Sequence, residues 1–542
     1  MLAVDVAVQP DQFLHRLVVQ VSGDGRQVGG ALGDRVGPPV VGGDVVGGAG
    51  VAPQVAGLGP VVGERDADDP LVGVVSVHDV RQLGPSVAFQ GDEHPPVQFG
   101  EQGEQCVLFG VLGHDSFNGP HRAGVPPRGA RRTMTVLRQE ADPVEAGLDA
   151  GALERLDRHF ARRVDEGRLP GFLVAVARGG RVAHLTAYGA RDVAAGLPVE
   201  SDTLWRIYSM TKPVTAVAAL MLMEEGRLSL DDPVGRHLPA FARPRVYEGG
   251  SGDGVRTRPP AGPLLVRHLM THTAGLTFAF YHSHPVDALY REAGLESSVA
   301  PGTDLAGTTE VYARLPLQFD PGTQWNYSVA SNVLGRIVEV VSGRPLDVFL
   351  AERIFRPLGM TDAGFEVTDA QAERLAEMYG ESDDGGIEPI EGLPLRGRPR
   401  FLSGSGGMVA SAHDFHRFME LLRRRGELDG VRLLSPATVD LMTRNHLPGG
   451  ADLRAFGSRP AHDVPGNEGV GFGLGVSVVV DPSRTQAPSA LGSYGWSGVA
   501  TTTFWVDPGR DLTVQFYTQV RPRSSHTVFR DLKRLVHEAV TR

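Results

Sequence analysis

The chain has 542 residues, a formal net charge of -11 at pH 7 and one cysteine, Cys106. Because this length exceeds what one hydrophobic core usually supports, we expect two or more folded units. The net negative charge gives no indication of nucleic-acid binding. A lone cysteine excludes both a disulfide framework and a cysteine-based metal site. No apolar run is long enough to span a bilayer. We therefore expect a soluble protein with no nucleic-acid or membrane partner and no cofactor.

Residues 1–133 differ in composition from the rest of the chain. Gly and Val dominate them, as in 42–48, and neither helical nor alternating periodicity persists. Three interpretations fit: a disordered extension, a β-rich domain, or sequence that is not translated in the cell. We favour the last, because Met134 follows an arginine-rich junction and opens a stretch of ordinary composition. Neither Met1 nor Met134 has the flanks of a signal peptide, so we expect a cytoplasmic protein.

From Leu148 onwards, periodicity predicts the secondary structure. Apolar residues at helical spacing indicate an amphipathic helix that ends near Gly167. Apolar runs at 172–177 and 181–188 flank Gly179-Gly180 and predict a β-hairpin. Helical patterns then follow at 333–341, 345–355 and 415–422, strand-like runs at 473–480, 500–506 and 512–518, and a last amphipathic helix at 528–540.

This order of elements predicts an α/β protein of the α+β type. One sheet, flanked by helices, would be assembled from both ends of the chain, about 148–228 and 470–542, and a mostly helical lobe would span about 229–469. Together they would make one domain, 134–542. A cleft between lobe and sheet is the expected place for a small-molecule site.

The stretch Tyr208–Val214 places a serine and a lysine three residues apart where a buried helix begins. If the helix starts at Ser209, then Ser209 and Lys212 share one face, and the serine lies at the positive end of the helix dipole. A desolvated lysine can be neutral and accept the serine proton, which arginine cannot do. Arginine carries almost all the positive charge, and the other lysine is Lys533. The alternative is that Ser209 caps the helix and Lys212 is a solvated charge.

Four histidines suggest a metal site, but the pattern does not favour one. His268 and His272 are four residues apart, and His282 and His284 follow. The zinc motif H-E-x-x-H is missing from the sequence, so we expect no metal. Ser209 and Ser497 also lack the G-x-S-x-G pattern of an α/β-hydrolase, and 404–407 lacks the G-K-[ST] of a phosphate loop.

Several motifs in order resemble the serine hydrolases of the class C β-lactamase and penicillin-binding-protein-like family. Ser209-Met210-Thr211-Lys212 matches the nucleophile motif S-x-x-K. His272-Thr273-Ala274-Gly275-Leu276 is similar to the H-T-[SA]-G-L turn, Pro357-Leu358-Gly359-Met360 to a helix end, and Gly404-Ser405-Gly406-Gly407-Met408 to a glycine-rich turn. The resemblance spans about Leu148 to the C-terminus and implies a β-lactamase-like fold with an antiparallel sheet.

Two departures from the family pattern point to its esterase branch, the family VIII carboxylesterases. Tyr327 matches the second catalytic segment, usually Y-x-N, but Val329 replaces the asparagine. In the third element, usually K-T-G or H-T-G, Trp496-Ser497-Gly498 puts tryptophan in place of the cation. The resemblance implies that these three residues bind substrate, and that losing the cation leaves an apolar wall without attraction for an anionic acyl group. The alternatives are that Tyr327 and Trp496 only pack.

Taken together, the sequence predicts a serine hydrolase that cleaves small carboxylic esters through an acyl-enzyme on Ser209. Either Lys212 or Tyr327, with its pKa lowered by the lysine, would accept the proton. By resemblance, the backbone N–H groups of Ser209 and Val499 would form the oxyanion hole. Alternatives within the family are a β-lactamase, a D-amino-acid peptidase and an acyltransferase; a non-catalytic binding domain is the alternative outside it. The oligomeric state and acyl chain length are left open.

Overall fold

The computed structural model describes residues 136–458, 466–522 and 526–541, and five strands nearer the N-terminus. The chain divides into two units, 1–131 and 132–542. In the first unit, three strands form an antiparallel sheet and two others form a pair: β1 Ala3–Asp11, β2 Leu14–Gly23 and β3 Arg26–Ala31; β4 Val72–His78 and β5 Gln105–Val111. Met134 lies outside the described residues, so the interpretation of 1–133 as untranslated sequence stays a prediction.

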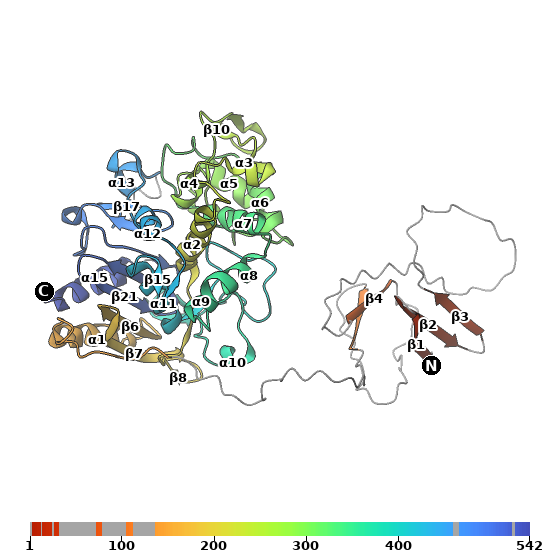
Figure 1. Ribbon diagram of the computed structural model, residues 1–542, viewed down its shortest axis with the longest axis horizontal. Helices are drawn as coiled ribbons and strands as arrows, with labels where there is room; N and C mark the ends of the chain where they lie inside the picture. The colour runs from red at the N-terminus through yellow and green to blue at the C-terminus, as the bar shows by residue number, and fades with distance from the viewer. Residues whose placement is uncertain are drawn as a thin grey trace. The chain divides into compact units, whose positions relative to one another are not determined.

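An eight-stranded antiparallel sheet forms the centre of the second unit, in the order β17-β18-β19-β20-β21-β6-β7-β8 (Figure 1). Strand β6 comes from the start of the unit and pairs with β21 from near its end, with Leu173 opposite Tyr517. This confirms the prediction of one antiparallel sheet assembled from both ends of the chain. The strands are β6 Gly171–Arg178, β7 Arg181–Asp192, β8 Leu197–Pro198, β17 Val470–Phe472, β18 Ser477–Val479, β19 Tyr494–Gly498, β20 Thr502–Asp507 and β21 Leu512–Tyr517.

Helices cover both faces of this sheet. On one face, α1 (Ala150–Asp165) and α15 (His526–Ala539) lie side by side although they come from opposite ends of the unit (Figure 1). On the other face, α2 (Thr211–Glu224) and α11 (Ala412–Arg423) belong to the larger core. Alternate residues of β6 face the two cores, so the strand is buried along almost its whole length. Burial on both faces explains why its sequence is a continuous apolar run.

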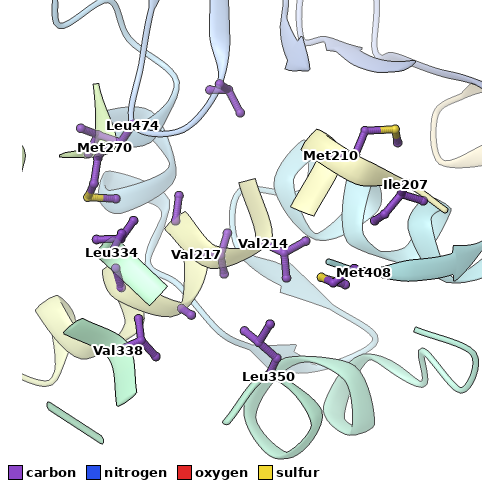
Figure 2. Packing of buried hydrophobic residues seen from close by; sticks show 14 of the residues in the cluster. Ile207, Met210, Val214, Val217, Met270, Leu334, Val338, Leu350, Met408 and Leu474 are labelled. Carbon is purple, nitrogen blue, oxygen red and sulfur yellow. The ribbon is translucent and has the colours of Figure 1, made fainter. Parts of the chain in front are cut away.

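The nucleophile helix α2 lies at the boundary between the sheet and the helical lobe. Every residue from Thr211 to Leu222 is buried, as expected for a helix enclosed on all sides. Figure 2 shows side chains of α2, such as Val214 and Val217, among Leu334 and Val338 of α7 (Ala330–Ser342), Met270 and Leu474. The predicted buried helix is therefore confirmed.

Helices also dominate the lobe, although short strands interrupt it. The remaining helices are α3 Val234–His237, α4 Val266–Met270, α5 Pro285–Glu292, α6 Leu305–Arg314, α8 Leu346–Leu350, α9 Arg356–Leu358, α10 Asp369–Ala372, α12 Pro436–Met442 and α13 Leu453–Phe456. The remaining strands are β9 Leu204–Arg206, β10 Val246–Gly249, β11 Arg256–Arg258, β12 Tyr379–Glu381, β13 Ile387–Pro389, β14 Val409–Ser411, β15 Glu427–Leu428, β16 Val431–Arg432 and β22 Val520–Arg521. Such two- to four-residue strands are too short for a period to show in the sequence.

The structure corrects two of the predicted elements. The α-helix begins at Thr211 rather than at Ser209, which lies in the preceding 3₁₀ turn η1 (Tyr208–Met210). The apolar run 473–480 is not one strand, because a turn separates β17 from β18. At its centre Gly475 has a φ of 86°, and a Cβ there would lie 2.6 Å from the Cβ of Ala216. The turn thus packs directly on α2 and buries Leu474.

Candidate active site

The short strand β9 leads into the turn that contains Ser209. It pairs with β14, and the N–H of Ile207 donates to the carbonyl of Met408. These hydrogen bonds fix the backbone that leads to Ser209. Tyr208 then adopts a φ of 42°, a left-handed conformation that costs a non-glycine residue energy and persists only where its surroundings impose it. Ser209 follows in η1, half-buried, between the buried Ile207 and Met210. The strained turn presents the Ser209 hydroxyl at the edge of the core.

Lys212 is enclosed beside this hydroxyl. Its Nζ lies 3.0 Å from Ser209 Oγ and 2.8 Å from the carbonyl oxygen of Ser405, and 4.4 Å from the centre of the Tyr327 ring. The side chain is buried, and none of the ion pairs found among the described residues includes it. Burial lowers the pKa of Lys212 well below its usual value. A neutral amine at this position can accept a proton, so the alternative of a solvated charge is wrong.

Tyr327 completes a triangle around Ser209. Its hydroxyl donates to Ser209 Oγ at 2.7 Å and accepts a long hydrogen bond of 3.4 Å from Trp496 Nε1. Burial raises the pKa of Tyr327 to about 12, and the hydrogen bonds to Ser209 and Trp496 only partly offset this. The expectation that Lys212 lowers the pKa of Tyr327 is therefore wrong, because a buried amine that has lost its proton carries no charge to stabilise a phenolate.

An aromatic surround fixes the Tyr327 ring. His272, Phe278 and Trp496 place their ring centres 4.8, 5.5 and 5.4 Å from it, and Trp325 stacks at 6.3 Å. Burial lowers the pKa of His272 well below its usual value, so its ring is neutral and packs. In the sequence, His272 was considered as a metal ligand and as part of a turn, and no pattern placed it beside Tyr327. Its place beside Tyr327 follows from the backbone, since the N–H of residue 326 donates to the carbonyl of His272.

Strand β19 passes directly beside the approach to the serine. A Cβ on Gly498 would lie 2.5 Å from the carbonyl oxygen of Ile207, so only glycine permits this contact. Trp496 faces Tyr327, whereas Ser497 is half-buried in the same strand opposite Thr503. Val499 follows the end of the strand with its side chain 48 % exposed. The binding roles of Trp496, Ser497 and Gly498, and the oxyanion hole of Ser209 and Val499, stay predictions.

The other histidines have local structural contacts. His268 Nδ1 accepts from the N–H of Leu265 at the start of α4, and His284 Nδ1 accepts from the N–H of Val286 at the start of α5. His282 sits in a left-handed turn with a φ of 52°. Within 136–458, 466–522 and 526–541, no group of three or more His, Cys, Asp or Glu residues is placed to hold a metal ion.

Comparison with known proteins assigns this site to a family. The β-lactamase family profile matches residues 156–538. The chain belongs to the β-lactamase family. Esterase EstB of Burkholderia gladioli is 33% identical to it over 400 residues, which cover 70% of this chain and 93% of EstB. Monacolin J acid methylbutanoyltransferase of Aspergillus terreus is 28% identical over 423 residues, covering 73% of this chain and 97% of the transferase.

A solved structure extends the likeness. EstCE1, described as a hydrolase with promiscuous acyltransferase activity, is 29% identical and superposes with a TM-score of 0.60, covering 71% of this chain and 99% of EstCE1. These relatives place this β-lactamase-family member with the serine hydrolases of the esterase branch, and they confirm the β-lactamase-like fold. The protein is a serine hydrolase. No helix in the described part of the chain combines the length and apolar character that crossing a membrane requires.

Proposed function

We propose that this enzyme is a carboxylesterase that forms an acyl-enzyme on Ser209. The observation that carries the proposal is the position of Ser209 Oγ, which lies 3.0 Å from Lys212 Nζ and 2.7 Å from the Tyr327 hydroxyl. A serine becomes a nucleophile when a group within hydrogen-bond reach can take its proton. Here a buried amine whose pKa is lowered lies within that reach.

Lys212 is the better candidate for the base. A neutral amine has two N–H bonds and one lone pair. One N–H meets the Ser405 carbonyl and the face of the Tyr327 ring lies 4.4 Å away, which leaves the lone pair for the Ser209 hydroxyl. Tyr327, with a pKa of about 12, holds its proton in the free enzyme and instead donates to Ser209 Oγ. Lys212 therefore accepts the proton, and Tyr327 orients the oxygen.

The two half-reactions then balance. Ser209 Oγ attacks the ester carbonyl, its proton moves to Lys212 Nζ, and the oxyanion is held by backbone N–H groups. The bond to the alcohol breaks, and the alkoxide takes the proton from Lys212, which leaves the acyl group on Ser209. A water molecule then attacks the acyl carbon and gives its proton to Lys212. The carboxylic acid leaves, and Ser209 recovers its proton.

Apolar walls favour neutral acyl groups over charged ones. Trp496 borders the site with an indole where other members of the family place a cation, and Val329 is buried where they place an asparagine. Phe278 stacks on Phe280 with ring centres 4.8 Å apart, and Phe280 is 52 % exposed. Aromatic surface thus extends from Tyr327 to solvent, which suits a small neutral ester.

A side-by-side substrate panel tests the proposal. We expect kcat/KM for a short-chain p-nitrophenyl ester to exceed that for nitrocefin by about 10²-fold or more, because the carboxylate of nitrocefin finds no charge-assisted partner at Trp496. Steady-state rates of the full chain are measured with both substrates. Equal or faster turnover of nitrocefin would replace the esterase proposal with a β-lactamase.

The second candidate function is acyl transfer. It is favoured by the transferase from Aspergillus terreus and by the promiscuous activity in the description of EstCE1. In this reaction an alcohol replaces water in the second half-reaction, and Lys212 takes the proton of that alcohol. Adding a primary alcohol to the ester assay and quantifying the new ester against free acid separates the two functions. An excess of transfer product at low alcohol concentration would favour the transferase.

The lowered pKa of Lys212 predicts a specific pH profile. The base works only as a neutral amine, so kcat/KM falls as pH drops through the pKa of Lys212 and is flat above it. Because burial moves this pKa below 10.5, the plateau begins below that value, and Tyr327 stays protonated until pH approaches its own pKa of about 12. Rates for a neutral ester from about pH 5 to about pH 10 measure this. A kcat/KM that is still rising steeply at the upper end of this range would contradict a shifted lysine.

A further inference from the structure

The segment 403–405 is clamped between two helices behind Lys212. On the α2 side, Thr215 Oγ1 donates to the carbonyl of Gly404 at 2.8 Å, and the N–H of Met408 donates to Thr211 Oγ1 at 3.2 Å. On the α7 side, a Cβ on Gly404 would lie 2.6 Å from the carbonyl oxygen of Ser331. Glycine is therefore needed here for the loop to pass between α2 and α7, and the loop carries the Ser405 carbonyl that Lys212 contacts.

Asn332 of α7 holds this segment through its side-chain oxygen. Oδ1 accepts from the N–H of Ser405 and from Ser403 Oγ, both at 3.0 Å, while Nδ2 donates to the Tyr312 hydroxyl at 3.2 Å. The residue is completely buried. Ser405 Oγ is buried and finds no partner among the described residues, and the polar contacts of Ser405 come from its backbone, with the N–H on Asn332 and the carbonyl on Lys212.

From this chain of contacts we propose that Asn332 is a positioning residue for the catalytic amine, acting through the peptide groups of Ser405. The inference rests on the proposed role of Lys212 as the base. A lysine amine rotates freely about its last bond, so its lone pair meets Ser209 Oγ only if another contact fixes the rotation. The Ser405 carbonyl fixes it, and Asn332 fixes Ser405. The second catalytic segment lacks its usual asparagine at Val329, and Asn332 supplies an amide three residues later, one peptide removed from the lysine.

The Asn332→Ala variant tests this. Without Oδ1, the Ser405 peptide is free to shift, and we expect kcat for a short-chain ester to fall about 10²-fold with KM nearly unchanged, as for other misplaced catalytic groups. The matched control is Asn445→Ala. Asn445 Oδ1 accepts from two backbone N–H groups, those of Leu447 and Phe472, at 3.1 Å each, so loss of this oxygen removes as many hydrogen bonds as loss of Asn332 Oδ1, but outside the segment 403–405. It should lower the unfolding midpoint but keep kcat within about threefold.

The Asn332→Asp variant provides a readout that a merely structural role would not move. It keeps an acceptor oxygen for Ser405, so it should recover most of kcat. Its carboxylate favours the protonated form of nearby Lys212, so the acidic limb of the kcat/KM profile should shift to higher pH. This variant also keeps the inference testable if Asn332→Ala does not fold.

The outcomes separate this inference from the proposed function. If the unmodified enzyme neither turns over esters nor reacts with a fluorophosphonate probe, the proposed function fails. If it is active but Asn332→Ala keeps kcat within about threefold, or loses no more than Asn445→Ala at an equal loss of stability, the positioning role is overturned. An unshifted pH profile in an active Asn332→Asp variant would also overturn it.

Discussion

Replacement of Ser209 by alanine is expected to lower kcat for a short-chain p-nitrophenyl ester by a factor on the order of 10⁴ or more. Lys212 and Tyr327 both converge on Ser209 Oγ, and without this oxygen neither has a hydroxyl to activate. Folding should survive, because the hydroxyl is half-buried and its loss leaves only a small void at the edge of the core. Steady-state rates, together with the thermal unfolding midpoint of each variant, measure both expectations.

Covalent labelling with a fluorophosphonate tests the same role of Ser209. The probe should modify the unmodified enzyme at Ser209, as located by peptide mass spectrometry, and leave the Ser209→Ala variant unlabelled. Ser483→Ala is the matched control, since its hydroxyl bonds Asp481 in an exposed turn. It should retain full labelling and turnover. Undiminished ester hydrolysis by Ser209→Ala would remove Ser209 from the mechanism and point to another nucleophile.

Periodicity predicted the framework of the fold because its long elements bury continuous faces. Helix α1 and strands β6, β7, β20 and β21 lie close to their predicted positions, and joining the two ends of the chain in one sheet follows from their order. The turn at Gly475 was missed because it buries Leu474 as a strand would, and hydropathy does not distinguish the two. The start of α2 was misplaced by two residues, because a 3₁₀ turn continues the helical spacing.

The candidate site was predictable where chemistry depends on residues near in sequence, and not where it depends on the fold. Ser209 and Lys212 lie together as their spacing predicts. Tyr327 is 118 positions from Ser209, and its place came from family resemblance rather than from any local pattern. The direction of its pKa was predicted wrongly, since the burial of Tyr327 depends on contacts with segments distant in the sequence. The one indication of Asn332 in the sequence is that it is a polar residue among the apolar positions of a buried helix.

Replacement of Lys212 is expected to have the second large effect on activity. Two variants distinguish the loss of the positive charge from the loss of proton transfer. Lys212→Arg keeps a cation but cannot lose its proton, and Lys212→Met keeps the apolar stem but removes the amine. Both should lower kcat/KM by about 10²–10⁴-fold, the range for loss of a general base. Retention of more than about a tenth of the activity by Lys212→Met would assign the base role to another group.

The stability of the same two variants should change in opposite directions. Between the lowered pKa of folded Lys212 and its ordinary value of 10.5, the unfolded chain binds more protons than the folded one, so stability is lost as pH falls through this window. At neutral pH the folded protein therefore bears the cost of burying Lys212. Lys212→Met removes that cost and should unfold at a higher temperature than the unmodified enzyme, whereas Lys212→Arg buries a permanent charge without an ion partner and should unfold at a lower one. A rise in thermal stability together with the loss of turnover would show that the lysine is kept for its proton rather than for packing, and a fall with both variants would contradict a neutral amine in the folded enzyme.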